Sequence, residues 1–313
     1  MSISSSGRAR ENHTPTQRVL VTGSAGVIGE ALRGALESEG VEVLGFDLRA
    51  SGAEKGDVRD RAALEMATRG CTGVIHLAAV SRVVWGERDP DACQATNVNG
   101  TRNVITAALN RAERPWLVFA SSREVYGEPD ALPVTEDASL RPVNVYGRSK
   151  AEGEALVTEA RDSGLRAGIL RFSNVYGSPS DHPDRVVPAF ARAASEGACL
   201  RITGAQSAFD FVHIDDTVAG ILAFVHLLTR GADSQSPPPV HLSTGLGTTL
   251  GELARIAVEL AATTATVEEL PARGHDVSRF VGDPSRARAV LGWSPRISLR
   301  DGLIRLLADL GAR

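Results

Sequence analysis

The sequence has few cysteines and no long hydrophobic run, and each shortage excludes a class of protein. Its 313 residues include three cysteines, Cys71, Cys93 and Cys199, whose wide separation matches neither a disulfide framework nor a metal-binding spacing. No apolar run approaches the ~20 residues that a membrane-spanning helix needs. The N-terminus carries no hydrophobic segment typical of a secretory signal. We therefore expect a cytoplasmic protein with buried, reduced thiols, no bound metal and no membrane partner.

The sequence also lacks an excess of charge of either sign. Lys and Arg number 34 against 38 Asp and Glu, so the formal net charge is −4. This balance gives no electrostatic basis for binding nucleic acid or an anionic membrane. The hydrophobic fraction of 42% is ordinary for a globular protein, whereas residues 1–17 are polar, Ser-rich and predicted to form a disordered tail.

What the sequence does contain is an alternation of short apolar runs with segments of helical period. Strands are predicted at 18–23, 41–47, 73–79, 116–122 and 166–177. Helices are predicted at 27–40, 97–112 and 149–164. This alternation predicts an α/β fold, a Rossmann-type doubly wound parallel sheet covered by helices on both faces. We predict a first domain over 18–177, to which 209–227 returns, and a smaller C-terminal α/β domain over 178–313.

A glycine-rich loop joins the first predicted strand to the first predicted helix. In TGSAGVIG (22–29), Gly23 permits a tight turn, Gly26 lets the backbone approach a pyrophosphate, and Gly29 lets the helix pack closely on the strand. Asp47 ends the second strand, where a carboxylate accepts hydrogen bonds from the adenosine ribose and repels a 2′-phosphate. The sequence therefore predicts an NAD site rather than an NADP site, a preference that Arg49 softens.

A second motif carries groups suited to proton transfer. Tyr146 and Lys150, in YGRSK, lie four residues apart and so share one face of a helix. A phenol has an ordinary pKa near ~10, and a neighbouring ammonium lowers that pKa. Ser122, at the end of a predicted strand, offers a hydroxyl to the same substrate oxygen. Together these residues could remove the proton of an alcohol while its carbon gives a hydride to NAD.

The order of the motifs resembles that of the extended short-chain dehydrogenases/reductases, in the NAD-dependent sugar epimerase/dehydratase (UDP-glucose 4-epimerase-like) group. The resemblance runs from Arg18 to the C-terminus. It rests on TGxxGxxG at 22–29, GDVRD at 56–60, HLAA at 76–79, TNVNGT at 96–101, SSREVYG at 121–127, YGRSK at 146–150, RFSNVYG at 171–177, FVHIDD at 211–216 and LGWSP at 291–295. It implies an NAD-binding first domain, a substrate-binding second domain and a nucleotide-sugar substrate. It also implies a homodimer formed through helices such as 97–112 and 149–163.

The resemblance implies roles for individual residues. The expected catalytic residues are Ser122, Tyr146, Lys150 and, as a further candidate, Glu124. The expected cofactor-binding residues are Gly23, Gly26, Val27, Ile28, Gly29, Asp47, Leu48, Arg49, Asp57, Val58, Leu77, Ala78, Ala79, Thr96, Tyr146, Lys150 and Ser173. The expected substrate-binding residues are Ser81, Arg123, Asn174, Val187 and Arg273.

One position departs clearly from the family pattern. Phe209 stands before DFVH, where the family usually has an arginine that pairs with a nucleotide diphosphate. An apolar ring cannot replace a bidentate guanidinium. Either Arg273 and a neighbour such as Arg185 or Arg201 hold the phosphates, or the substrate is not the usual one.

A second departure lies directly after Ser122, where this sequence reads Arg123-Glu124. The pattern of the 4,6-dehydratases resembles Asp-Glu at these two positions. Glu124 could act as a base at the sugar C5, or it could only bond backbone or a substrate hydroxyl. Arg123 cannot donate a proton in place of the missing acid. The arginine therefore weakens the case for an ordinary 4,6-dehydratase.

These observations leave four hypotheses for the function. The leading one is a 4-epimerase that oxidises the sugar C4 hydroxyl to a transient ketone and returns the hydride, with NAD bound throughout. A dehydratase or decarboxylase would use Glu124 as its base. A net oxidoreductase would act on a small alcohol or ketone and release NADH. A non-catalytic NAD-sensing regulator is the fourth, and the Tyr146–Lys150 pair counts against it.

Overall fold

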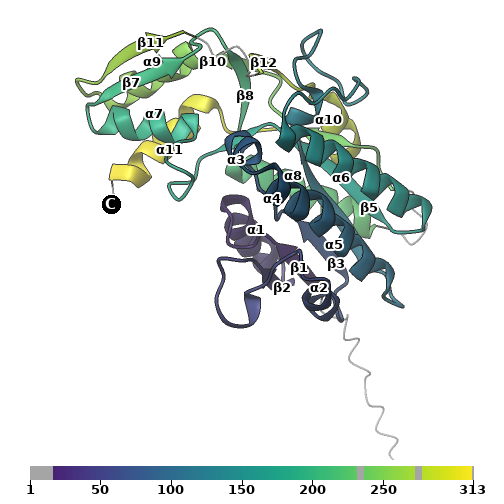
Figure 1. Ribbon diagram of the computed structural model, residues 1–313. Helices are drawn as coiled ribbons and strands as arrows, with labels where there is room; N and C mark the ends of the chain where they lie inside the picture. The colour runs from purple at the N-terminus through teal and green to yellow at the C-terminus, as the bar shows by residue number, and fades with distance from the viewer. Residues whose placement is uncertain (1–16, 231–235, 272–276, 312–313) are drawn as a thin grey trace, which may run out of the picture.

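A parallel sheet of six strands forms the centre of the protein (Figure 1). The computed structural model describes residues 17–230, 236–271 and 277–311, so all but one residue of the predicted tail lies outside it. The strand order is β2-β1-β3-β4-β5-β9. The strands are β1 (Arg18–Thr22), β2 (Glu42–Phe46), β3 (Gly73–His76), β4 (Trp116–Ser122), β5 (Ala167–Phe172) and β9 (Val240–Leu242). All adjacent pairs run parallel, which confirms the predicted fold class.

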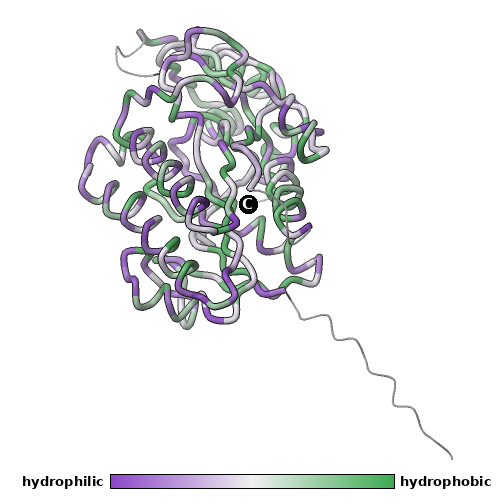
Figure 2. The backbone as a smooth tube through the Cα atoms, turned by 90° about the vertical axis from the view of Figure 1, so that its right-hand side faces the viewer, coloured by the Kyte–Doolittle hydropathy of each residue, from purple (hydrophilic) through white to green (hydrophobic). Residues whose placement is uncertain are grey.

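Helices cover both faces of this sheet, which explains why its strands are apolar throughout. Every residue of β4 and β5 is buried, as a strand covered on both sides requires. One face packs against α1 (Val27–Ser38), α8 (Ile214–Thr229) and α10 (Ser285–Leu291). The other packs against α2 (Arg61–Ala67), α5 (Gly100–Leu109) and α6 (Val145–Asp162). Figure 2 shows hydrophobic stretches running through the interior and hydrophilic ones on the outer turns.

The order of the strands creates a crevice at the carboxyl end of β1. Strand β2 lies on one side of β1 and β3 on the other, so the connections after β1 and β2 lead to opposite sides of β1. In open parallel sheets, ligands bind outside the carboxyl ends of the strands at such a reversal. The glycine loop between β1 and α1 lies at this point.

A second group of elements lies beyond the carboxyl edge of the large sheet, at the upper left of Figure 1. It has its own apolar core, which includes Val187, Phe190, Leu253 and Leu303. Its strands are β6 (Asn174–Tyr176), β7 (Cys199–Thr203), β8 (Ala208–His213), β10 (Gly247–Thr249), β11 (Thr266–Leu270) and β12 (Arg279–Phe280). Its helices are α7 (Val186–Ser195), α9 (Leu250–Ala261) and α11 (Leu299–Gly311). Strand β8 pairs with β6, β10 and β12, and β11 pairs with β7.

The chain passes between these two groups more than once. Helix α8 contacts α1 and β5, whereas β8, directly before it, belongs to the second group. Strand β9 and helix α10, within the range expected for the C-terminal domain, also lie on the six-stranded sheet. The division of the chain at residue 177 stays a prediction.

The cysteines differ from expectation in one case. Cys71 and Cys93 are buried, but Cys199 is exposed, because it begins β7, a strand whose first four residues alternate between exposed and buried. The described residues hold no group of three or more His, Cys, Asp and Glu side chains suited to a metal. Nor do they include a helix long and apolar enough to cross a membrane.

Candidate active site

A cavity of about 720 Å³ opens where the strands of the large sheet end. Its walls are the glycine loop, the carboxyl ends of β2, β3, β4 and β5, the start of α6 and the segment 181–188 that leads into α7. Nearly all the predicted site residues line it. The exceptions are Asp57, whose carboxylate binds the neighbouring Arg59 at 2.6 Å, and Arg273, which lies outside the described residues.

The glycine loop has the geometry that its sequence requires. Gly23 has φ of +74°, and a Cβ there would lie 2.7 Å from the backbone nitrogen of Ala78. A Cβ on Gly29 would lie 2.3 Å from the carbonyl oxygen of Gly23. Helix α1 begins directly after Gly26, so the unpaired N–H groups and the positive end of its dipole face the cavity. The loop therefore fits the pyrophosphate of a dinucleotide.

Asp47 lies directly after β2 and is 8% exposed. Its carboxylate accepts hydrogen bonds from the backbone N–H groups of Ala25, at 3.1 Å, and Arg49, at 2.8 Å. The Arg49 side chain lies 3.6 Å from the same carboxylate and donates to the Ala25 carbonyl at 2.6 Å. The Asp47 carboxylate is thus fixed at the cavity wall, in part by the glycine loop, in a position suited to bind a ribose.

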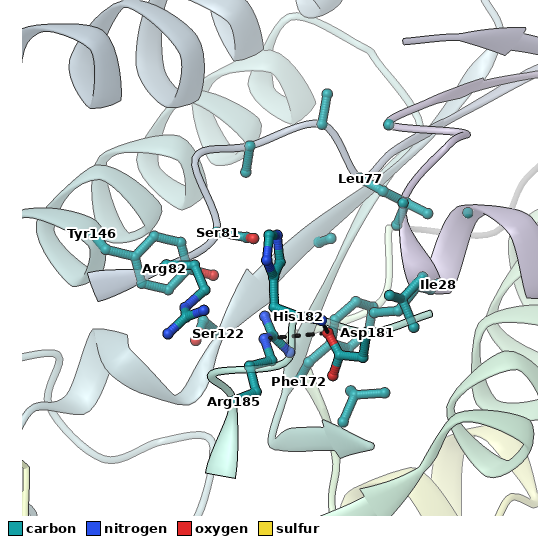
Figure 3. Close-up of a pocket in the computed structure, with 18 of the residues that line it drawn as sticks. Ile28, Leu77, Ser81, Arg82, Ser122, Tyr146, Phe172, Asp181, His182 and Arg185 are labelled. Carbon is teal, nitrogen blue, oxygen red and sulfur yellow. Dashed lines mark hydrogen bonds and ion pairs between the residues drawn. The ribbon is translucent and has the colours of Figure 1, made fainter. Parts of the chain in front are cut away.

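The predicted catalytic trio comes together at the other side of the cavity. Ser122 is the last residue of β4, and Tyr146 and Lys150 lie in the first turns of α6, whose N-cap Asn144 accepts a hydrogen bond from the Gly147 N–H. Tyr146 is 9% exposed and Lys150 4%. Lys150 Nζ donates to the Ala120 carbonyl at 2.8 Å and lies 6.0 Å from the centre of the Tyr146 ring. Figure 3 shows Tyr146 and Ser122 beside Arg185 at the cavity.

Burial dominates the proton affinity of this pair. It raises the pKa of Tyr146 to about 12, while a hydrogen bond from Ser122 and the charge of Arg185 act in the opposite direction. Burial also lowers the pKa of Lys150 to about 8. The charge of Arg185 thus opposes the effect of burial on the pKa of Tyr146.

Glu124 lies in the short helix η3 (Arg123–Tyr126) and is 7% exposed. Its Oε1 atom pairs with Arg123 Nη2 at 2.8 Å. Its Oε2 atom accepts a hydrogen bond from Asn144 Nδ2 at 2.7 Å. Both oxygens of this carboxylate are therefore already engaged by protein groups.

Sequence reasoning missed several residues in one wall of the cavity. Arg82, beside helix α3 (Val83–Arg88), forms an ion pair with Asp184. Trp85 meets the ring of His182 edge-on, with centroids 4.7 Å apart. Figure 3 shows the neighbouring ion pair, Asp181 with Arg185, whose charged atoms lie 3.6 Å apart. The only local signal was a Pro- and Asp-rich loop directly after a strand.

The two arginines named as possible phosphate ligands have different positions. Arg185 lines the cavity. Arg201 does not, because it lies on β7 and pairs with Glu268 on β11 at 3.1 Å, with its side chain 74% exposed.

The parallel sheet, the glycine loop at its strand reversal and the buried Ser-Tyr-Lys trio define a dinucleotide-dependent α/β enzyme. The profile of the NAD dependent epimerase/dehydratase family matches residues 19–236. The chain belongs to this family, which confirms the predicted family, the enzyme class and the NAD cofactor.

Relatives with two different reactions lie at similar distance from this chain. It is 30% identical to a UDP-glucose 4-epimerase from Rhizobium leguminosarum bv. trifolii over 95% of this chain and 98% of that relative. It is 33% identical to a dTDP-glucose 4,6-dehydratase from Streptomyces griseus over 94% of each.

Two solved structures with nucleotide sugars bound resemble this chain in fold. MoeE5 in complex with UDP-glucuronic acid and NAD superposes with a TM-score of 0.85 at 29% identity, over 94% of this chain and 99% of that chain. UDP-glucose 4-epimerase from Thermotoga maritima, with UDP-glucose, superposes with a TM-score of 0.86 at 27% identity, over 95% and 99%.

Proposed function

We propose that the protein is an NAD-dependent nucleotide-sugar 4-epimerase. The observation that favours epimerisation over elimination is that both carboxylate oxygens of Glu124 are already bonded, one to Arg123 and one to Asn144. An elimination needs a base at C5 and an acid at C6, whereas epimerisation needs neither. Arg123 follows Ser122 directly, and its guanidinium cannot serve as the acid that elimination requires.

The proposed reaction begins at the C4 hydroxyl of the sugar. Ser122 holds the hydroxyl oxygen, and the Tyr146 side chain, once ionised to the phenolate, removes its proton. Arg185 favours that phenolate electrostatically. Gly23, Gly26 and Asp47 would hold NAD, which would supply the acceptor and donor of the C4 hydride. Inversion at C4 would then require the keto sugar to turn over in the cavity, so that its opposite face meets the cofactor.

The proposed substrate is a nucleotide sugar, because both relatives described above are named for UDP- or dTDP-linked glucose. Ser81, Asn174 and Val187 are the proposed substrate contacts, and all three line the cavity. We further propose that the protein works in the cytoplasm as a homodimer, paired through α5 and α6.

Elimination or decarboxylation is the second candidate. Glu124 lines the cavity beside Ser122, and an ion pair with Arg123 can open when substrate enters. A glutamate freed in this way could remove the C5 proton beside the ketone.

The test is a panel of UDP- and dTDP-sugars incubated with the enzyme and NAD in deuterated water, analysed by NMR and mass spectrometry. A C4 epimer without deuterium at C5 is the expected product. Loss of water or carbon dioxide, with solvent deuterium at C5, would support the second candidate instead. Stoichiometric release of NADH would indicate a net oxidoreductase. Absence of any change with every sugar would contradict the whole substrate class.

A further inference from the structure

Two departures from the family pattern, Arg123 and Phe209, contact each other across the fold. The guanidinium carbon of Arg123 lies 4.7 Å from the centre of the Phe209 ring and 6.0 Å from that of Phe280. Phe209 and Phe280 are paired neighbours on β8 and β12. A guanidinium stacks well on aromatic faces, which fix its plane without using its N–H groups. The two rings thus support the cation from the second group of elements.

The N–H groups of Arg123 are only partly used. Nη2 pairs with Glu124 at 2.8 Å, and Nε donates to Asn174 Oδ1 at 3.2 Å. Nη1 is buried and has no hydrogen-bond partner among the described residues. The Arg123 side chain is 13% exposed, so little water is available to replace that partner. A buried donor without a partner is rare in folded proteins.

The position of this guanidinium is that of a ligand contact. Arg123 lines the cavity and follows Ser122, the proposed oxygen-binding residue, directly in the chain. Its partner Asn174 lines the same cavity. Phe209 is not among the lining residues. The residue at 209 therefore holds the cation at 123 rather than facing the ligand itself.

We propose that Arg123 binds the anionic group of the nucleotide-sugar substrate, and that Phe209 is the apolar support that positions it. The family pattern has its guanidinium at the position of Phe209, on β8. In this chain, Arg123, directly after β4, supplies the guanidinium instead. This inference rests on the proposed function for its substrate class. The anion is either the diphosphate or a carboxylate on the sugar, since both present paired oxygens to a guanidinium.

The test measures binding rather than turnover, with NAD at saturation and calorimetric titration of uridine, UDP, UDP-glucose and UDP-glucuronate, and of dTDP in parallel. We expect Arg123→Ala to weaken binding of the anionic ligand roughly 10- to 100-fold, the range for a lost charge-assisted hydrogen bond. Arg123→Lys should recover little, because an ammonium lacks the fork geometry. Uridine should bind as before. Arg279→Ala is the matched control, since Arg279 is a half-exposed arginine on β12 paired with Glu128.

The pattern across ligands identifies the anion. Equal losses for UDP and both UDP-sugars would assign Arg123 to the diphosphate. A loss confined to UDP-glucuronate would assign it to the sugar carboxylate. No loss for any ligand, or an equal loss for uridine, would overturn the proposal.

A second variant tests the shared site. Phe209→Arg combined with Arg123→Ala returns a guanidinium to the family position, and we expect it to recover most of the lost affinity. A double variant no tighter than Arg123→Ala would overturn the claim that the two positions serve one anion. Thermal melting of each variant checks that it folds.

The two proposals fail differently. A wild-type protein that binds none of the nucleotides contradicts the proposed substrate class, and this inference with it. Tight binding that Arg123→Ala leaves unchanged contradicts this inference alone. Tight, Arg123-dependent binding without any turnover supports this inference and contradicts the proposed reaction.

Discussion

Tyr146 is a buried phenol that lines the cavity. Removing its hydroxyl is the most direct test of the proposed proton transfer at the scale of single residues. Tyr146→Phe deletes the oxygen and keeps the ring. We expect turnover to fall by at least ~100-fold, the lower end for general acid–base catalysis. NAD binding should change little, because the glycine loop and Asp47 remain. Steady-state rates and NAD titrations measure the two effects. Turnover close to that of the wild type would contradict a role for the phenol in proton transfer.

Glu124 separates the two candidate reactions. In Glu124→Gln one amide oxygen must serve both Arg123 and Asn144, so we expect a loss of about 1–3 kcal/mol in unfolding free energy. Turnover should fall by less than roughly tenfold if no proton passes through this residue. Glu128→Gln is the control, since Glu128 makes surface contacts with Ser278 and Arg279. An inactive Glu124→Gln that still forms NADH would favour elimination.

Asp47 decides between the two dinucleotides. Its carboxylate is fixed by two backbone N–H groups, so a 2′-phosphate would meet a charge that cannot move away. We expect NAD to bind more tightly than NADP, and Asp47→Ala to narrow the gap by weakening NAD. Titration of both dinucleotides against wild type and variant measures this. Tighter NADP binding to the wild type would contradict the assignment, and it would point to Arg49.

At the scale of elements, one buried ion pair ties helix α6 to the sheet. Arg171 on β5 pairs through two bonds, at 2.9 and 2.6 Å, with Glu154 on α6. Both side chains are almost fully buried. Ser121 on β4 donates to the same glutamate, and Tyr126 accepts from the same arginine. Helix α6 also carries Tyr146 and Lys150, so this network sets the position of the trio.

Breaking one side of this pair should cost more than removing both. Arg171→Met leaves the Glu154 charge buried and unpaired, which typically costs about 3–5 kcal/mol. Adding Glu154→Leu should recover much of that loss. Chemical denaturation of the wild type, both single variants and the double variant gives the coupling energy. Additive losses would show that the two charges do not depend on each other.

The elements that sequence reasoning predicted well are those with local signals. Three patterns each involve only a few neighbouring residues: the glycine loop, the apolar strands and the Tyr-x-x-x-Lys motif. The place of each in the fold could therefore be predicted from the local sequence. Strand β9 is only three residues long and carries no such pattern. The Arg123–Phe209 contact joins residues 86 positions apart in the numbering, so only the folded chain brings the two departures together. The Arg82–Asp184 ion pair escaped prediction for the same reason.

At the scale of the whole molecule, Asp210 connects the two groups of elements. It lies on β8 and is fully buried. It accepts hydrogen bonds from the backbone N–H groups of Thr244 and Gly245, in the loop after β9. Burial raises the pKa of Asp210 from its ordinary value of 3.8 to about 6, against the opposing effect of those hydrogen bonds.

This shift predicts a pH dependence of stability. Between pH 3.8 and about 6 the folded state binds the Asp210 proton and the unfolded state does not, so this contribution is lost as pH rises through that window. The stability lost across that pH window is about 3 kcal/mol. Asp210→Asn removes the titration, so the wild-type stability should fall relative to the variant between those pH values. Urea denaturation of both proteins across the range measures the difference. Parallel curves would contradict the raised pKa.

The contact between Trp85 and His182 gives the protein an internal optical probe. Trp85 is 38% exposed and lines the cavity, whereas Trp116 and Trp293 are each 6% exposed and are not among the lining residues. A molecule that enters the cavity changes the polarity around one indole and leaves the other two in place. We expect a change in tryptophan emission on adding dinucleotide or nucleotide, and its absence in Trp85→Phe. Ligand binding in the cavity can then be followed in real time by tryptophan fluorescence, without labelling the protein.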